Sequence, residues 1–180
     1  LIKNFKKISV DQSSEDMRDF ELNTYMQEIL TTFTSELPLR PVTLEITFKD
    51  KAIPMHSYPG AIAQIVINML QNTLVHAFDD EQEGKIFIQT QKHNDKVRII
   101  FSDDGKGVDQ SVAEKIFEPF ITTKRNQGGT GLGLNITYNL VTQQLGGTIR
   151  IDSEHKKGTS FIIEIPSNLA SIPNEESTLA

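Results

Sequence analysis

The sequence contains no cysteine, and this absence excludes a disulfide framework and any metal site built on thiolates. It also lacks an uninterrupted apolar run of the roughly 18 to 20 residues that a membrane-spanning helix needs. The chain starts at Leu1 without a basic segment followed by an apolar one, so no signal peptide is indicated. Because the sequence begins at Leu1 and not at a Met, we expect a fragment of a larger protein, and any membrane anchor of that parent would lie outside this chain.

An excess of positive charge is missing as well. The sequence has 18 Lys and Arg against 24 Asp and Glu, which gives a net charge of -6. An acidic chain gains nothing from counterion release on DNA or RNA, so nucleic acid is a poor candidate ligand. A length of 180 residues is enough for one domain with a real core. A cysteine-free composition is compatible with a reducing cytoplasm, where we expect the protein to work whether or not its parent is membrane-anchored.

Apolar periodicity divides the chain into three parts. Residues 1–20 are predicted to be the end of an upstream helix and a linker, residues 21–166 a compact domain, and residues 167–180 a disordered tail. The pattern predicts helices over 22–37, 59–78 and 132–145, and strands over 42–48, 53–57, 86–91, 97–103, 148–152 and 159–165. Hairpins are mixed with helices, which favours an α+β two-layer sandwich. We expect about three helices on one face of a mixed, mostly antiparallel sheet of about five strands.

A line of polar side chains follows the predicted helix 59–78. Asn68 and Asn72 are four residues apart and therefore share a face, which Gln64 and His76 extend by one turn each way. An Asn carbonyl oxygen suits Mg²⁺ together with water and phosphate oxygens. Taken alone, the same pattern is more often a set of solvated or capping amides on an exposed helix edge.

A second group of residues follows the predicted strand 97–103. Asp103 continues the apolar row of that strand and should point toward the core, where a carboxylate is costly unless it is bonded. An ionised carboxylate only accepts hydrogen bonds, so it would suit an exocyclic amine such as that of adenine. Gly105 and Gly107 would let the backbone turn sharply and leave room for a flat ring. The alternative is an ordinary turn after a strand.

The long stretch from 104 to 130 is rich in Gly, Lys and Thr, and long loops inside compact domains are usually functional. Its apolar island 116–121 either fastens a lid to the domain or forms a small satellite cluster. The run 128–134, Gly-Gly-Thr-Gly-Leu-Gly-Leu, leads into a predicted helix and would form an anion site there. It matches neither a Walker A loop nor a dinucleotide fingerprint, and the alternative is a plain flexible hinge.

Together these segments resemble the four boxes of the histidine-kinase catalytic domain, in the gyrase, histidine kinase and mismatch-repair ATPase superfamily with its Bergerat ATP-binding fold. The resemblance covers roughly residues 22–166. Residues 68–72 resemble the N box of the family and residues 103–107 the first glycine box. Residues 117–120 resemble the F box and residues 129–133 the second glycine box. A Gly-Thr pair of the family matches residues 158–159.

The resemblance implies ATP and Mg²⁺ as cofactors. Asn72 would bind the metal with Asn68 in support, and Asp103 would accept from the adenine amine beside Thr159. A mobile lid would run over about 108–129, in which Lys124 and Arg125 would steady the γ-phosphate. The other residues expected at the nucleotide are His76, Gly105, Gly107, Phe120, Thr123, Gly129, Thr130, Gly131, Leu132 and Gly133.

Three departures from the family pattern stand out. The family often has Lys three residues after the metal-binding Asn, where this chain has Val75, and His76 either takes over that phosphate contact or caps the helix end. The usual Asp-Asn-Gly has Asp104 in place of Asn. The third departure is an absence. The family's phosphoacceptor His lies in a helical His-Glu or His-Asp motif upstream of the catalytic domain, and none of His56, His76, His93 and His155 has such a neighbour.

Three functions are compatible with these residues. The first is a kinase domain that transfers the γ-phosphoryl group of ATP to a histidine on a separate dimerisation domain of the parent, with a response regulator downstream. The second is a hydrolase of the gyrase or mismatch-repair type, and the third is a nucleotide-binding regulatory module without turnover. Hydrolases have a Glu general base one turn before the metal-binding Asn, where this chain has Asn68, so the kinase is favoured. We expect the isolated chain to be a monomer.

Overall fold

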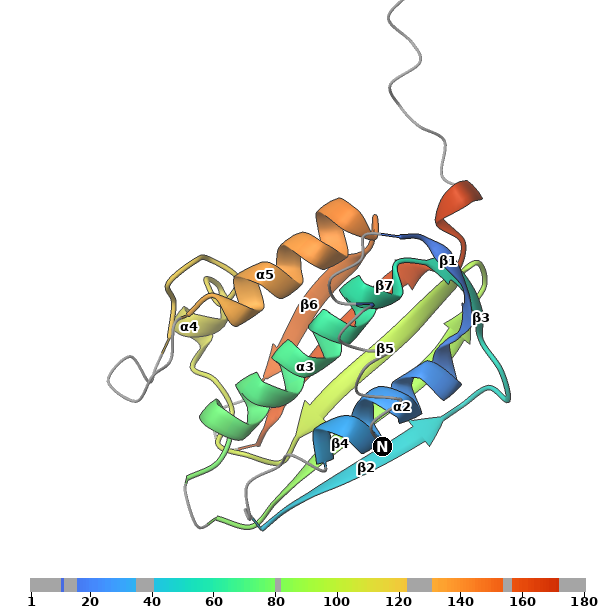
Figure 1. The fold of residues 1–180 in the computed structure, drawn as a ribbon. Helices are drawn as coiled ribbons and strands as arrows, with labels where there is room; N and C mark the ends of the chain where they lie inside the picture. Colours follow the sequence, from blue (N-terminus) through green and yellow to red (C-terminus); the bar gives the residue numbers. More distant parts are fainter. Residues whose placement is uncertain are drawn as a thin grey trace, which may run out of the picture.

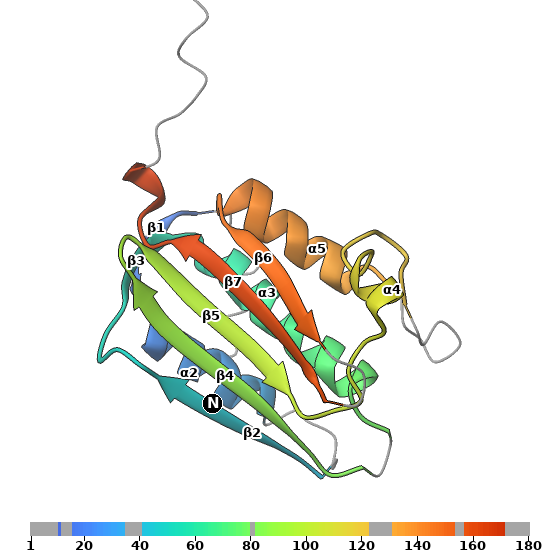
Figure 2. The same ribbon diagram turned by 180° about the vertical axis from the view of Figure 1, so that it is seen from behind.

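The structure, a computed structural model, describes residues 11, 16–34, 41–79, 82–122, 131–153 and 157–171. A mixed five-stranded sheet has the strand order β2-β4-β5-β7-β6, in which only the β2–β4 pair is parallel. Helices cover one face (Figure 1) and leave the other face bare (Figure 2). The predicted two-layer α+β fold is confirmed. The strands of this sheet are β2 (Val42–Phe48), β4 (Gly84–His93), β5 (Lys96–Asp103), β6 (Thr148–Ser153) and β7 (Thr159–Pro166).

The helical layer consists of α2 (Leu22–Thr34), α3 (Pro59–His76) and α5 (Gly133–Asn139), with α3 between the other two (Figure 1). α3 begins at a proline, which a first helical turn tolerates because its N–H has no partner there. Strands β5 and β7 bury every second side chain beneath it, as their sequence period predicts. The core thus lies between the covered sheet face and the helical layer, with contributions from α2, α3 and α5.

A second, two-stranded sheet precedes α3. Its antiparallel strands are β1 (Arg18–Glu21) and β3 (Pro54–Ser57). β1 lies in the segment expected to be a helix end and linker, so ordered structure starts earlier than predicted. Glu21 secures the junction with α2, because its carboxylate accepts hydrogen bonds from the backbone N–H groups of Ile53 (2.9 Å) and Asn23 (3.0 Å). A strand of four residues is too short to show a period in the sequence.

The chain after β7 is also placed as far as Ser171. Ser167 donates its backbone N–H to the Asp95 carbonyl (2.8 Å) in the β4–β5 turn, and its own carbonyl accepts from the His56 N–H (2.9 Å). A 3₁₀ turn, η3 (Leu169–Ser171), follows. The expected disordered tail therefore does not begin at residue 167, and the remainder, 172–180, lies outside the described residues.

Two further elements differ from the expectations. The helix predicted over 132–145 is α5 followed by a π-helical turn, η2 (Leu140–Gln144), in which Leu145 donates its N–H to the Leu140 carbonyl at 2.9 Å. The stretch expected to be irregular contains a short helix, α4 (Gln110–Ala113). Among the described residues, no helix combines the length and the apolar character needed to cross a lipid bilayer.

Candidate functional site

One pocket opens where the end of α3 meets the Asp103 end of β5 and the Thr159 end of β7. The segment after Gly107, which includes α4, closes its remaining side (Figure 1). Most of the lining is apolar with a few convergent polar groups, as in small-molecule sites generally. The polar side chains that line it are Asn72, Thr73, His76, Asp103, Thr122 and Thr159.

Asp103 lies at the inner end of β5, as its place in the alternating row predicts. It is only 9% exposed, and its Oδ1 accepts the backbone N–H of Gly105 at 3.0 Å. Burial raises the pKa of the Asp103 carboxyl to about 6, although the N–H groups of Gly105 and Thr159 oppose this shift. Thr159 is its register partner on β7, so the two side chains enter the pocket together. This pair can accept hydrogen bonds from an amine.

Glycines bring the backbone close around this aspartate. Gly158 has φ +86, and a Cβ there would lie 2.0 Å from the Asp103 carbonyl oxygen. Gly107, with φ +69, lines the pocket directly. Gly105 does not line it: a Cβ on this residue would meet the Ala77 carbonyl oxygen at 2.4 Å. Gly105 therefore allows the turn to pack on the end of α3, rather than making room for a ring.

The two asparagines of α3 have different surroundings. Asn72 lines the pocket, and its amide makes no hydrogen bond to another described residue. Asn68 is only 8% exposed and lies outside the lining. Its Oδ1 accepts from Gln64 (2.8 Å), and its Nδ2 donates to the Gly133 carbonyl (3.4 Å) at the start of α5. The structure thus places Asn68 as a link between α3 and α5 behind the pocket.

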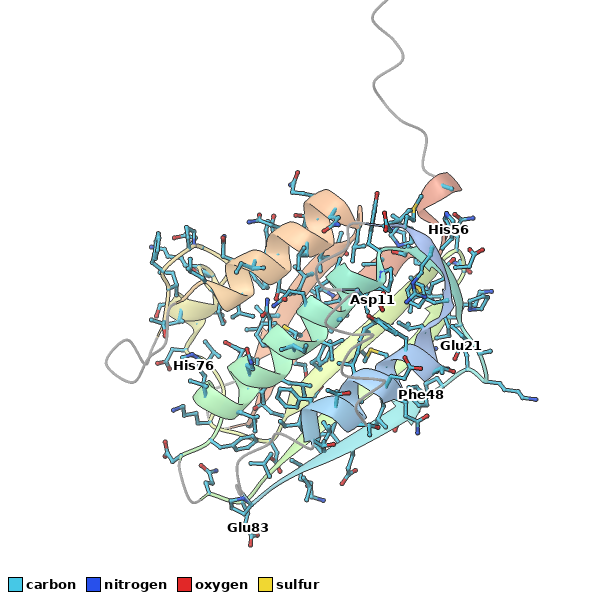
Figure 3. All side chains as sticks on the ribbon, viewed as in Figure 1. Asp11, Glu21, Phe48, His56, His76 and Glu83 are labelled. Carbon is cyan, nitrogen blue, oxygen red and sulfur yellow. The ribbon has the colours of Figure 1, made fainter. Side chains whose placement is uncertain are left out.

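The last turn of α3 brings His76 to the pocket and leaves Val75 on the surface. Val75 is 38% exposed, whereas His76 is half-buried and belongs to the lining. Figure 3 shows His76 at the end of α3, on the side of the chain that leads to α4. An imidazole at this place can donate to a phosphate oxygen, which is compatible with the first of the two roles considered for His76, a contact with phosphate.

The aromatic residues of the F box pack in opposite directions. The Phe117 ring lies 6.3 Å from Phe161 in the core and 5.5 Å from Tyr138 on α5, measured between ring centroids. Phe120 is 63% exposed and has φ +65, so it projects from the segment and does not line the pocket. The neighbouring Ile121 and Thr122 do line it.

The second glycine box supports this segment by its backbone. Gly131 has φ +67, and its carbonyl accepts the Phe120 N–H at 3.0 Å. A Cβ on Gly131 would meet the Phe120 backbone at 2.6 Å, whereas one on Gly133 would meet nothing within 4 Å. Gly131, Leu132 and Gly133 do not line the pocket themselves. Other residues predicted at the nucleotide, Thr123, Lys124, Arg125, Gly129 and Thr130, lie outside the described residues.

A family model for histidine kinase-, DNA gyrase B-, and HSP90-like ATPases matches residues 58–169, from the start of α3 to the chain beyond β7. The chain belongs to this ATPase family. The match contains every residue that lines the pocket. Use of ATP follows from the family.

The relatives of this ATPase domain include sensor histidine kinases. It is 32% identical over 149 residues to sensor histidine kinase ZraS of Escherichia coli, covering 83% of this chain and 31% of ZraS. It is 30% identical over 145 residues to sporulation kinase A of Bacillus subtilis, covering 81% of this chain and 23% of the kinase. The chain thus spans less than a third of these relatives. The solved catalytic domain of histidine kinase ThkA superposes with a TM-score of 0.74 at 29% identity, covering 85% of this chain and 97% of that domain.

Several lining residues of the ATPase domain were not predicted. They are mainly apolar, with two threonines as polar additions: Ala77, Val108, Val112, Ile116, Ile121, Leu134, Phe161, Thr73 and Thr122. Phe161 could have been found, because it lies two residues after Thr159 in an alternating strand. Val108 and Val112 follow the first glycine box four residues apart, which is a weak helical signal.

The site fits a magnesium ion only when the nucleotide supplies ligands. Among the described residues, no three His, Cys, Asp or Glu side chains cluster as a metal site. The Asn72 carbonyl oxygen is a suitable single protein ligand, since no described residue occupies it. Mg²⁺ usually keeps several waters and binds through few protein oxygens plus substrate phosphates, and one amide is compatible with that pattern.

Proposed function

We propose that this chain is the catalytic domain of a sensor histidine kinase and transfers the γ-phosphoryl group of Mg-ATP to a histidine on a separate dimerisation domain. The observation that carries the proposal is the joint placement of Asp103 and Asn72 at one pocket. Asp103 with Thr159 would bind the adenine amine, and Asn72 with His76 would face the phosphates. Relatives named as sensor kinases support the assignment.

In this proposal the protein contributes positioning and charge complementarity. Magnesium, when bound, would neutralise phosphate charge and orient the phosphates for in-line transfer. Asn72 would hold the ion, and Lys124 and Arg125 would steady the γ-phosphate from the lid. The acceptor imidazole is already nucleophilic, so the domain needs no general base of its own.

A hydrolase is less well supported because of Asn68. An amide cannot take a proton at neutral pH, so it cannot activate water as a general base. The Asn68 side chain is also engaged by Gln64 and by the Gly133 carbonyl, away from the pocket. We therefore expect only faint ATPase activity from the isolated domain. The working compartment would be the cytoplasm, which supplies ATP, and a response regulator would take the phosphoryl group from the dimerisation domain.

The decisive experiment mixes this chain with the helical domain that precedes it in the parent protein and labelled Mg-ATP. Acid-labile, alkali-stable label on the helical domain is the expected result. The matched control uses a helical domain in which the acceptor histidine is replaced by Gln, and this variant should stay unlabelled. Rapid ATP turnover without the helical domain would favour the hydrolase. ATP binding without either transfer or turnover would favour a regulatory module.

A further inference from the structure

A single hydroxyl behind the pocket connects two of its lining segments. Ser153 is the last residue of β6 and the register partner of Thr159 on β7. Its Oγ accepts the backbone N–H of Val108 at 2.9 Å, donates to the Gly158 carbonyl at 3.1 Å and lies 3.2 Å from Thr159 Oγ1. Ser153 does not line the pocket, but Val108 and Thr159 both do.

We infer that Ser153 is a positioning residue, which orients the Thr159 hydroxyl for base recognition and ties the start of the lid to it. The inference rests on the proposed function only in taking adenine as the base that enters the pocket. Val108 is the first residue after the first glycine box, where the lid begins. A lid fastened at this point moves together with the group that recognises the base.

The hydrogen bonds of Ser153 determine whether the Thr159 hydroxyl can donate or only accept a hydrogen bond in the pocket. Ser153 has one hydroxyl hydrogen and two lone pairs. The Gly158 carbonyl can only accept, so it takes the hydrogen, and the lone pairs accept from the Val108 N–H and the Thr159 hydroxyl. Thr159 then presents only lone pairs to the pocket.

Base selectivity follows from this arrangement. The Asp103 carboxylate and the Thr159 oxygen become two acceptors side by side, which suits the amine of adenine. A guanine carbonyl at the same place would meet acceptors only and leave them unpaired. Without the Ser153 oxygen, Thr159 could turn its hydrogen toward the pocket, and adenine would lose the part of its advantage over guanine that Thr159 provides.

The backbone around Ser153 is packed closely enough for this bond to matter. The Gly158 carbonyl that accepts from Ser153 belongs to a glycine with φ +86, whose Cα lies directly against the Asp103 backbone. Loss of the hydroxyl therefore removes a support of the turn, of Thr159 and of the lid start at the same time. A purely structural serine would affect stability without changing the choice of base.

The test compares Ser153→Ala with a matched serine on the bare sheet face. Ser160 lies on β7, next to Thr159. Its hydroxyl bonds to Ser102 Oγ at 2.8 Å, and Ser160 does not line the pocket. We expect Ser153→Ala to weaken Mg-ATP binding about fivefold to tenfold and to reduce the preference for Mg-ATP over Mg-GTP. Ser160→Ala should leave both unchanged. Isothermal titration calorimetry with the two nucleotides gives both quantities.

Two further variants keep the test decisive if Ser153→Ala folds poorly. Ser153→Thr retains the oxygen and should restore most of the affinity. Thr159→Val removes the oriented hydroxyl without changing the shape, and it should lower the ATP preference by itself and make Ser153→Ala non-additive. The inference is overturned if Ser153→Ala keeps the native preference, if Ser160→Ala reproduces the loss, or if Thr159→Val still prefers ATP as before.

Failure of this inference can be told apart from failure of the proposed function. A native chain that binds no Mg-ATP would contradict the proposed function itself. A native chain that binds Mg-ATP, with variants that bind both nucleotides as the native chain does, would remove only the role of Ser153. Thermal unfolding of each variant, followed by circular dichroism, shows whether the compared chains are folded.

Discussion

The two sides of the pocket are built by different means. On the side of Asp103 and Thr159, the side chains sit on neighbouring strands whose backbones are paired in register. On the other side, the chain after Gly107 is attached by isolated contacts, such as the bond from Asn135 Nδ2 to the Phe117 carbonyl at 2.9 Å. A paired strand opens only with its whole sheet, whereas isolated bonds break locally at lower cost. The strand side is therefore preorganised, and the lid side can rearrange around a ligand.

The largest effect is expected at Asn72, on the side of the pocket that we propose for the phosphates. Asn72→Ala removes the only protein oxygen that we assign to the metal, and phosphotransfer to the helical domain should fall by at least about a hundredfold. The neighbouring Gln71 is exposed and outside the lining, so Gln71→Ala is the matched control. Transfer at the native rate by Asn72→Ala, measured with labelled ATP, would remove this residue from the mechanism.

A comparison of two glycines tests how rigid the strand side is. In Gly158→Ala the new Cβ would lie 2.0 Å from the Asp103 carbonyl oxygen at φ +86. We expect it to lower the free energy of unfolding by at least about 2 kcal/mol. Gly133→Ala places its Cβ in open space and should be neutral or stabilising by up to about 1 kcal/mol. Urea unfolding of both variants measures the difference, and equal stabilities would contradict the close packing of this turn.

Removal of the buried charge tests base recognition on the strand side. Asp103→Asn replaces one acceptor oxygen by a donor, and ATP binding should weaken by about 1 to 3 kcal/mol. Asp104→Asn is the control, because the Asp104 carboxylate is exposed and accepts the Lys85 N–H at 2.7 Å. Unchanged affinity of Asp103→Asn in calorimetry would exclude the carboxylate from adenine binding.

The pKa of Asp103 gives a pH dependence of about tenfold. With a pKa of about 6, the carboxyl is mostly ionised at pH 7 and mostly protonated at pH 5, so adenosine should bind about ten times more weakly at the lower pH. Adenosine is the probe because, unlike ATP, it carries no phosphate groups that could titrate in this pH range. His76 lines the same pocket, so Asp103→Asn is the control: this variant should abolish the change in affinity with pH if Asp103 causes it. If the affinity of this variant for adenosine still falls between pH 7 and pH 5, another group causes the pH dependence.

The stability of the unliganded domain should change in the opposite direction. The pKa of Asp103 is higher in the folded than in the unfolded chain, so the folded state holds this proton more tightly. Its stabilising contribution is complete below about pH 4 and is lost as the pH rises through about 6. Asp103→Asn should therefore lose less unfolding free energy, or gain more, than the native chain between about pH 4 and pH 7, and urea unfolding at both pH values checks the sign.

The smallest effect concerns the lid side. Phe120 adopts φ +65, which costs a residue with a Cβ more than it costs glycine. Phe120→Gly should therefore be more stable than Phe120→Ala by about 1 kcal/mol, although glycine is the more flexible residue in the unfolded chain. Thermal unfolding distinguishes the two variants, and a more stable alanine variant would show that this conformation is not kept in solution.

The sheet and the inward placement of Asp103 could be predicted because their signals are local. A period of two along β5 shows which side of the strand Asp103 faces, and no distant residue is needed to infer its burial. The helical spacing of Asn68 and Asn72 likewise predicts a shared line. It does not reveal that α5 covers one end of this line, so the expectation that Asn68 supports Asn72 did not include the burial of Asn68 between two helices.

Other features depend on contacts between distant segments. Phe120 is exposed because the backbone of Gly131 holds its segment in place, and neither residue alone indicates this. β1 is too short for periodicity and forms only because β3 pairs with it. Nothing in the sequence of Leu140–Gln144 distinguishes the π-helical turn from an ordinary α-helix, so the pattern predicts a continuous helix there.

The end of the domain that lies away from the pocket is a suitable place to attach a label. Arg18 pairs with Ser57, and His56 bonds to Ser167, so the first strand and the last described turn meet beside the Asp95 turn (Figure 1). His56 and His76 mark the two ends of the molecule (Figure 3). β5 runs from the Asp95 turn to the pocket and is itself about 24 Å long, at roughly 3.4 Å for each step from Lys96 to Asp103. A fluorophore or a fused reporter attached at this corner would leave the mouth of the pocket beside Asp103 clear.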